Sequence, residues 1–443
     1  MTYVLGVLVV VAGVALSIAL HEIGHLVPAK RFGVRCSQYM IGFGPTLWSK
    51  TKGETQYGLK AIPLGGYVRM IGMYPPRPGG RTEAGPSGRF GALIDEAREE
   101  SAREIGPGDE NRVFYKLSVP KKLVVMLGGP TMNLALATGL LAVAVSGIGT
   151  PTLVPTLSSI SACVPSTAPT VTKPQPDCLP GDPQSPAAKA GLQVGDTILA
   201  VGPTRVSTWA EATAAIRSAP GSALELTVDR GGSPLAVPVS IAALARPREG
   251  ADGRAQVRDG ALVTETVGFL GASPSRAEVR QPLSSVPGVM GDMLGATGSA
   301  LLGVPAKMVG VFQSVTGQAE RDPDGPMSVV GVGRLGGELT SGALGIDSPG
   351  AVAFLLVTLL VGLNLALFFF NLLPLLPLDG GHAIGAVWEG LKRRGARLLG
   401  RPDPGYVDVA KGLPIAYAVS TLVIVMSVLL VYADFVAPVR LAG

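Results

Sequence analysis

Long, nearly uninterrupted apolar runs dominate the hydrophobic pattern of the chain. A transmembrane helix needs about 20 mostly apolar residues, and four runs qualify. They cover Tyr3–Leu20, continuing toward Pro28, and residues 123–148, 351–373 and 415–432. The first run has no basic n-region and ends in His-Glu rather than in small residues, which excludes a signal peptide. The pattern therefore predicts a polytopic α-helical membrane protein with about four transmembrane helices.

The composition agrees with a membrane location. Of the 443 residues, 47% are hydrophobic and only 16% are charged, whereas soluble proteins carry about 25% charged residues. The net charge of +5 is small and dispersed. Because the chain has no basic stripe interleaved with aromatic residues, we expect no nucleic-acid partner.

The distribution of Lys and Arg predicts how the chain is oriented. Basic residues are frequent in residues 29–122 and 383–414, whereas residues 149–350 are slightly acidic. The positive-inside rule then places both basic regions in the cytoplasm, and both termini and residues 149–350 outside. The predicted protein crosses the cell membrane at 1–28, 123–148, 351–382 and 415–434.

The first cytoplasmic region has two parts. Residues 55–73 contain two strand-like runs, Tyr57–Pro63 and Tyr67–Gly72, on either side of Gly65-Gly66, which is typical of a β-hairpin. Residues 75–112 are rich in Pro, Gly, Arg and Glu and have no clear periodicity, which predicts a flexible insertion.

The outer segment begins with alternating short strands and helices. Strands are predicted near 153–161, 224–229 and 235–241, and a helix near 209–218, so residues 149–250 form a small α+β domain. Residues 251–350 are predicted to be a polar linker followed by a helix at 283–315. That helix is either amphipathic and interfacial or packed on the outer domain.

The three cysteines are divided between the two predicted compartments. Cys163 and Cys178 lie in one extracytoplasmic stretch rich in Pro and Thr, so we expect a local disulfide between them. The alternative is two unpaired thiols. Cys36 lies in the predicted cytoplasmic region and is expected to be free and reduced.

His21-Glu22-Ile23-Gly24-His25 is an H-E-x-x-H motif at the end of the first apolar run. Residues four apart share one face of a helix, so His21 and His25 can hold one Zn²⁺ through their imidazoles. Glu22 lies beside them and can accept a proton from an attacking water. Polar residues of this kind are costly in a membrane span and usually mark function.

A zinc hydrolase keeps three protein ligands and one open position, so a third ligand must come from another segment. Asp379 lies at the end of the third span. The first and third spans are separated by one other span and therefore run in the same direction, so His21, His25 and Asp379 emerge on the same side of the membrane. His382 is a rival ligand that spacing does not exclude. From Tyr3 to His21 a helix rises about 27 Å, which places the site near the inner edge of the bilayer.

Together these motifs resemble the site-2 protease family of intramembrane metalloproteases. The resemblance rests on HEIGH, on GPTMN at 129–133 and on PLDGGH at 377–382. It implies one Zn²⁺ held by His21, His25 and Asp379, with Glu22 as the catalytic base. It also implies that single-span membrane proteins are the substrates, such as anti-sigma factors already cut once by another protease.

The resemblance further assigns a substrate-binding role to two groups of residues. The hairpin at 55–73 would be membrane-associated and would present an edge strand to the substrate. Two asparagines would lie near the active cleft, or else form hydrogen bonds between helices. The expected substrate-binding residues are Asn371, Asn133, Leu64, Gly65, Gly66 and Tyr67. A plain hairpin packed on the helices remains the alternative.

The segment SPAAKAGLQVGDTILAVG at 185–202 is similar to the core of bacterial PDZ domains. PDZ domains bind extended peptides by strand addition, so the outer domain either binds a peptide or acts as a size filter for substrates. Two other function classes were weighed: a membrane PDZ adaptor with a structural zinc, and a metal transporter. The adaptor does not need Glu22 beside the ligands, and a transporter would carry polar groups along its spans rather than in one cluster.

Overall fold

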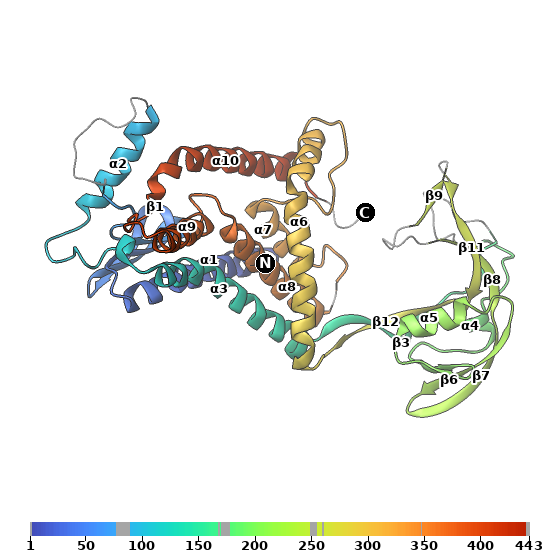
Figure 1. Ribbon diagram of the computed structural model, residues 1–443. Helices are drawn as coiled ribbons and strands as arrows, with labels where there is room; N and C mark the ends of the chain where they lie inside the picture. The colour runs from blue at the N-terminus through green and yellow to red at the C-terminus, as the bar shows by residue number, and fades with distance from the viewer. Residues whose placement is uncertain are drawn as a thin grey trace. The chain divides into compact units, whose positions relative to one another are not determined.

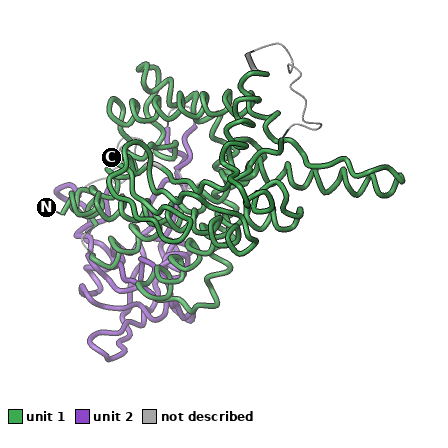
Figure 2. The backbone as a smooth tube through the Cα atoms, turned by 90° about the vertical axis from the view of Figure 1, so that its left-hand side faces the viewer, with its two compact units in different colours: residues 1–149, 280–443 green, residues 150–279 purple. Residues whose placement is uncertain are grey.

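The computed structural model describes residues 2–76, 89–166, 169, 178–248, 255–258, 261–346 and 348–439. The chain divides into two compact units, which Figure 2 shows in different colours. Unit 1 consists of residues 1–149 and 280–443, and unit 2 of residues 150–279. The long apolar helices and the motifs HEIGH, GPTMN and PLDGGH belong to unit 1, and the segment 185–202 belongs to unit 2.

Five helical segments of the described chain are long and apolar enough to cross a membrane. The expected number was about four, so this prediction was low by one. The segments are α1 (Thr2–Arg31), α3 (Val119–Ala142) with η2 (Val143–Ile148), η3 (Leu283–Ser285) with α6 (Val286–Val315), α8 (Pro349–Leu372), and η4 (Val409–Gly412) with α10 (Leu413–Val436).

The additional segment is α6, which was expected to be interfacial or packed on the outer domain. In the structure, α6 belongs to unit 1. Val286 and Met290 pack against Leu141 of α3 and Leu365 of α8, and Figure 1 shows α6 crossing the other helices. Its mean hydropathy is 1.3, compared with 2.6 for α1, because glycines interrupt the apolar run.

Close helix contacts in unit 1 are made through glycines. A Cβ on Gly24 of α1 would lie 2.3 Å from the carbonyl oxygen of Gly128 in α3. A Cβ on Gly6 would lie 2.1 Å from the carbonyl oxygen of Gly336 in α7 (Val329–Ser341). Small residues of this kind let helix backbones approach each other where no hydrophobic force drives helices together. The α1 helix is thereby held between α3 and α7.

A polar contact fixes α8 against α1. The amide nitrogen of Asn364 donates to the hydroxyl of Ser17 at 2.9 Å, and Leu360 packs where Gly13 leaves space. Both side chains of the pair are buried. Since Gly13 precedes Ser17 as Leu360 precedes Asn364, the two helices run in the same direction at this contact.

Two strands follow α1, and their pairing differs from the predicted hairpin. β1 (Cys36–Lys52) and β2 (Thr55–Met70) pair antiparallel and are connected at Gly53, whereas the turn was expected at Gly65-Gly66. Residues 38–41 pair with 56–59 along one edge and with 66–69 along the other. The chain bends at Gly65, whose φ of 109° favours glycine.

Two ranges that were predicted to be cytoplasmic and irregular contain helices. The predicted flexible insertion at 75–112 includes α2 (Arg89–Arg103), while residues 77–88 lie outside the described part of the chain. A short helix, η1 (Phe114–Lys116), follows. The predicted loop at 383–414 includes most of α9 (Asp379–Leu398) and η4. The irregular segments of this region are residues 373–378, between α8 and α9, and residues 399–408, between α9 and η4.

Unit 2 is built on a six-stranded sheet with the order β12-β3-β4-β6-β7 and with β5 on β4. The predicted strands and the predicted helix are confirmed. The elements are β3 (Thr150–Ile160), α4 (Pro186–Lys189), β4 (Thr197–Val201), β5 (Thr204–Arg205), α5 (Trp209–Arg217), β6 (Ala223–Arg230), β7 (Ser233–Ser240), β8 (Ala242–Pro247), β9 (Val257–Arg258), β10 (Ala261–Leu262), β11 (Thr264–Phe269) and β12 (Ala272–Val279). A core of apolar side chains, including Leu157, Ile198 and Leu226, holds the sheet against α5.

The range predicted to be extracytoplasmic was expected to divide at residue 250 into a domain and a linker, but unit 2 extends to Val279. The reason is that β12 pairs with β3, the first strand of the unit, so the end of the unit returns to its beginning. The predicted disulfide is confirmed, since Cys163 and Cys178 are bonded. Cys36 is buried and free.

Candidate active site

Three side chains from two helices converge on one point in unit 1. The Nε2 atoms of His21 and His25 lie 3.2 Å apart. The Oδ2 atom of Asp379 lies 3.3 Å from Nε2 of His21 and 3.2 Å from Nε2 of His25. Ligands of a tetrahedral zinc are about 3.3 Å apart, given Zn–N distances of about 2.0–2.1 Å. The spacing therefore fits one metal ion.

The hydrogen bonding of His25 indicates which of its ring nitrogens is free to bind a metal ion. Nδ1 of His25 lies 2.7 Å from the carbonyl oxygen of Val125 in α3. A carbonyl only accepts, so Nδ1 carries the proton and Nε2 of the neutral ring presents a lone pair. That lone pair faces Oδ2 of Asp379, a buried oxygen with no hydrogen-bond partner. Two atoms that both carry lone pairs repel each other at this distance unless a cation lies between them. The imidazole nitrogens and the carboxylate oxygen therefore fit a metal ion, and this combination of ligands suits zinc.

Asn133 of α3 holds the other histidine. Its side chain is fully buried, and its amide nitrogen lies 3.1 Å from Nδ1 of His21, while its amide oxygen has no partner. When Nε2 of His21 binds a metal, Nδ1 carries a proton, and a half-turn of the amide then presents its oxygen as the acceptor. Orientation of a metal-binding histidine by such a partner fixes its tautomer and ring position. Asn133 was expected to contact substrate, but its burial places it behind His21.

A glycine of α3 provides the space for both rings. A Cβ on Gly129 would lie 2.2 Å from Nε2 of His25 and 2.7 Å from Cε1 of His21. Together with the contact between Gly24 and Gly128, this brings α3 directly behind the histidine pair. The pair Gly128-Gly129 within an apolar span is the sequence signal for this close helix contact, and the motif GPTMN alone did not predict it.

Asp379 is the first residue of α9, and α9 is anchored beneath the cluster. Nζ of Lys122 in α3 donates to Glu389 of α9 at 2.8 Å, with 6% and 2% of the two side chains exposed. Removing one partner of such a buried pair is costly, because the other charge is left without compensation. The ion pair thus fixes the position of α9, and with it the carboxylate of Asp379.

His382, the rival ligand, is not part of the three-residue cluster. Its ring faces Tyr74, with 6.5 Å between the ring centroids. It lines a small cavity of about 20 Å³ together with Lys122 and Glu389. His382 lies three residues after Asp379 in α9, near the cluster, but its ring lies beside Tyr74 and is not one of the three converging groups.

Glu22 lies next to the metal cluster and against the end of β2. Its carboxylate interacts electrostatically with His21, His25 and Asp379, and the backbone N–H of Val68 donates to it. A Cβ on Gly66 would lie 3.0 Å from Cγ of Glu22. The close approach of β2 to the catalytic motif therefore requires glycine at position 66.

In the described part of the chain, the edge of β2 beside Glu22 pairs with no second strand. Residues 66–69 pair with residues 38–41 on one side, and Ile71 donates to the carbonyl of Arg35 on the same side. Because N–H groups alternate along a strand, the N–H of Gly66 points to the same outer side as that of Val68. Sequence reasoning did not identify Val68 as a functional residue.

The remaining predicted site residues have other surroundings. Tyr67 donates to Gln38 at 3.3 Å and stacks near Phe43, with centroids 6.3 Å apart. Asn371 donates to the carbonyl of Leu367 in its own helix at 3.1 Å. Leu64 is on β2 by its backbone, but its side chain lies outside the described residues.

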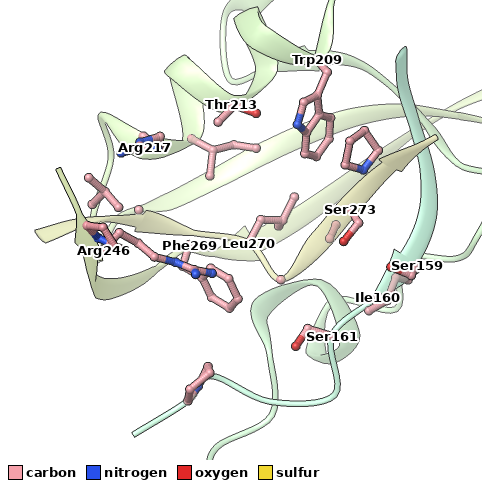
Figure 3. Close-up of a pocket in the computed structure, with 18 of the residues that line it drawn as sticks. Ser159, Ile160, Ser161, Trp209, Thr213, Arg217, Arg246, Phe269, Leu270 and Ser273 are labelled. Atoms are coloured by element: carbon pink, nitrogen blue, oxygen red, sulfur yellow. The ribbon is translucent and has the colours of Figure 1, made fainter. Parts of the chain in front are cut away.

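Unit 2 contains the largest cavity described, about 660 Å³. It lies between α5 and residues 267–274. Figure 3 shows Trp209, Thr213 and Arg217 extending from α5 on one side, and Phe269, Leu270 and Ser273 on the other. Arg246 lies at one end, with its guanidinium 5.0 Å from the centre of the Phe269 ring.

Comparison with known proteins identifies the family. Residues 9–398 match the model of Peptidase family M50. The chain belongs to peptidase family M50. It is thus a peptidase, and the resemblance to site-2 proteases is confirmed. Family membership and the five apolar helices together identify a multi-pass membrane protein.

Relatives with similar sequences align with all or most of the chain. Zinc metalloprotease Rip1 of Mycobacterium tuberculosis (strain ATCC 25618 / H37Rv) is 34% identical over 446 residues, covering 100% of both chains. The protein of the same name from Mycolicibacterium smegmatis is 32% identical over 453 residues, again covering both chains fully. Zinc metalloprotease RasP of Geobacillus kaustophilus is 26% identical, over 84% of this chain and 86% of the relative.

The space at Gly129 makes a direct prediction about the M50 site. Gly129→Ala places a methyl group 2.2 Å from Nε2 of His25, so the histidines must shift and divalent metal affinity should fall about 10–100-fold, as for other changes to the support of metal ligands. Chelator competition on the purified protein measures this. The matched control is Gly139→Ala in the same helix, where a Cβ meets nothing within 4 Å. Equal affinities for the two variants would contradict the role given to Gly129.

Proposed function

We propose that this M50 peptidase is an intramembrane zinc metalloprotease that cuts single-span membrane proteins in or near their transmembrane segments. The observation that carries the proposal is the cluster of His21, His25 and Asp379 beside Glu22, at the end of the apolar helix α1. The names of the relatives, zinc metalloproteases, support Zn²⁺ as the ion, one per chain.

The proposed ligands are His21, His25 and Asp379, which leaves one tetrahedral position open for water and substrate. A bound Zn²⁺ supplies Lewis-acid polarisation of the scissile carbonyl and of the attacking water. Glu22 accepts the proton of that water and later delivers it to the leaving amine. Val68 keeps the Glu22 carboxylate oriented toward the cluster.

The physical state of the substrate explains the position of β2. A transmembrane substrate arrives as a helix, in which every backbone group is bonded internally and the scissile carbonyl is shielded. Unwinding it in lipid leaves N–H and C=O groups unpaired, at several kcal/mol each. The outer edge of residues 66–70, next to Glu22, is suited to pair with the unwound segment as an added strand. Leu64, Gly65, Gly66 and Tyr67 form or adjoin this proposed edge.

The two proposed roles of the asparagines differ. Asn133 positions His21 through its buried amide. Asn371 lies at the end of α8, immediately before the irregular segment that leads to Asp379, and its half-buried amide is bonded to its own helix. We retain Asn371 as a proposed substrate contact, because its position borders the segment through which water and substrate would reach the cluster.

The proposed topology places the active site near the cytoplasmic face. Lys and Arg are concentrated in residues 29–122 and 383–414, which supports a cytoplasmic location for the β-sheet, α2 and α9. Unit 2 and both termini are then extracytoplasmic. The proposed substrates are single-span proteins such as anti-sigma factors that another protease has already shortened.

Unit 2 is proposed to be a PDZ domain. The support is the sequence at 185–202, the fold of a small sheet with one main helix, and the cavity between α5 and residues 267–274 (Figure 3). Such a groove suits an extended peptide, and a domain of this size outside the membrane also excludes bulky substrates. A membrane PDZ adaptor with structural zinc explains the groove but not Glu22, since a structural site fills all four positions with protein ligands.

The role of Glu22 predicts a separation of binding from catalysis. Glu22→Gln keeps the shape of the side chain but removes its ability to accept a proton. Cleavage should fall by about 10²–10⁴-fold, while zinc content stays near that of the wild type. Zinc analysis and a cleavage assay on the same preparation measure both. Glu338→Gln in α7, far from the motif in sequence, is the control. Near-normal cleavage by Glu22→Gln would remove Glu22 from the mechanism.

The third ligand is tested by a pair of substitutions. Asp379→Ala removes the ligand oxygen of the cluster. Loss of a residue that only supports a ligand lowers metal affinity about 10–100-fold, so loss of this ligand should weaken zinc binding by more than about 100-fold. His382→Ala should retain zinc, because His382 lies outside the cluster. Metal analysis and chelator competition decide between them. Loss of zinc only in His382→Ala would show that the assignment of Asp379 is wrong.

The strand-addition step predicts a fixed cross-linking register. Membrane peptides that accumulate with Glu22→Gln, identified by mass spectrometry, provide a substrate. In that variant, Tyr67→Cys and Arg69→Cys should form disulfides with substrate cysteines two residues apart, since side chains two apart share one face of a strand. Ser49→Cys, exposed on the opposite arm of the sheet, should not. Strand addition would be contradicted if Ser49→Cys cross-linked equally well, or if positions 67 and 69 formed disulfides with substrate cysteines at any spacing.

A further inference from the structure

We propose that α9 lies on the membrane surface and that its exposed face binds the anionic headgroups of phospholipids. This face takes no part in the proposed cleavage step. It is an unpartnered surface on the helix whose first residue is Asp379. The argument rests on the apolar residues of that face, on the charges beside them, and on where α9 begins.

The α9 helix has two apolar faces, and only one is covered by protein. Ala383, Ala386 and Glu389 are buried, and Gly390 packs against Val119 of α3. The opposite face is open: the exposed fractions are 52% for Ile384, 40% for Val387, 53% for Trp388, 58% for Leu391 and 80% for Leu398. Their spacing of three, four and seven residues places them in one continuous stripe.

Basic side chains border this stripe on both sides. At 3.6 residues per turn, Lys392 and Arg394 lie about 80° from Ile384, one on each side. Arg397 and Arg401 follow beyond them, and all four are exposed. In the described part of the chain none of the four has an ion-pair partner, and Nζ of Lys392 lies 5.7 Å from the ring centre of Trp388. The acidic residues of α9, Asp379 and Glu389, are committed to the metal cluster and to Lys122.

This arrangement selects a lipid surface over other partners. A helix with a tryptophan-containing apolar stripe and a basic border is typical of the bilayer interface, where each basic residue near an anionic surface strengthens binding by roughly fivefold. A second copy of the same face would bring Lys392 and Arg394 against their equivalents, which repel. The α9 helix also follows the apolar helix α8 after only six residues, 373–378, so its start is close to the membrane.

Binding on this face has a consequence for the metal site. The packed face of α9 is fixed to α3 by Lys122 and Glu389, and lipid would cover the remaining face. With both faces occupied, the first turn of α9 and the carboxylate of Asp379 are held in place. The lipid requirement is separate from catalysis, so it is measured without a cleavage assay.

Trp388 is the natural probe, because the chain has only three tryptophans. In the full-length protein with Trp48→Phe and Trp209→Phe, reconstituted in bilayer nanodiscs, we expect brominated phosphatidylglycerol to quench Trp388 at least about twofold more than brominated phosphatidylcholine, given the charge attraction. Replacing Lys392, Arg394, Arg397 and Arg401 with Gln should remove the preference. Gel filtration confirms that this variant remains folded.

A matched variant and a soluble anion complete the test. Gln substitutions at four exposed basic residues of unit 2, Lys189, Arg205, Arg258 and Arg276, should leave the preference intact. Excess inorganic phosphate should also leave it intact if the ligand is a lipid headgroup. The proposal is overturned if both lipids quench equally, if neither quenches, or if phosphate abolishes the preference, which would indicate a free-anion site.

Discussion

The close approach of α1 and α3 is the constraint on which the rest of unit 1 depends. Gly24 and Gly128 let the two backbones meet, and Gly129 leaves room for the rings of His21 and His25. Only at this separation do the carbonyl of Val125 and the amide of Asn133 reach the outer nitrogens of the two histidines. A larger residue at any of these glycines would push α3 away and release both rings.

Two breaks in regular structure then complete the site around this helix pair. The first break separates α8 from α9 and turns Asp379 back toward the histidines, while the ion pair between Lys122 and Glu389 holds α9 against α3. The second is the bend at Gly65, which brings the last part of β2 against Glu22. Both breaks are part of the site, because each brings a residue of another segment to the histidine motif.

Unit 1 also combines a rigid centre with surfaces left open to the environment. The contacts around the cluster are buried, whereas α9 and the turn regions of β1 and β2 expose large apolar side chains, including Trp48 and Trp388. A soluble protein would cover such surfaces, since contiguous apolar patches promote association. In a membrane protein, exposed apolar surfaces of this kind are suited to contact with lipid.

The sequence by itself determined the local chemistry of this protein. Helical spacing places His21, Glu22 and His25 on neighbouring positions of α1, and long apolar runs identify most of the membrane helices, because both depend on contacts within one segment. Only the tertiary structure brings Asp379, and not His382, to the two histidines, includes α6 in unit 1, and pairs residues 38–41 with residues 56–59 on one side and 66–69 on the other. These features depend on contacts between residues far apart in the chain, which neither periodicity nor spacing encodes.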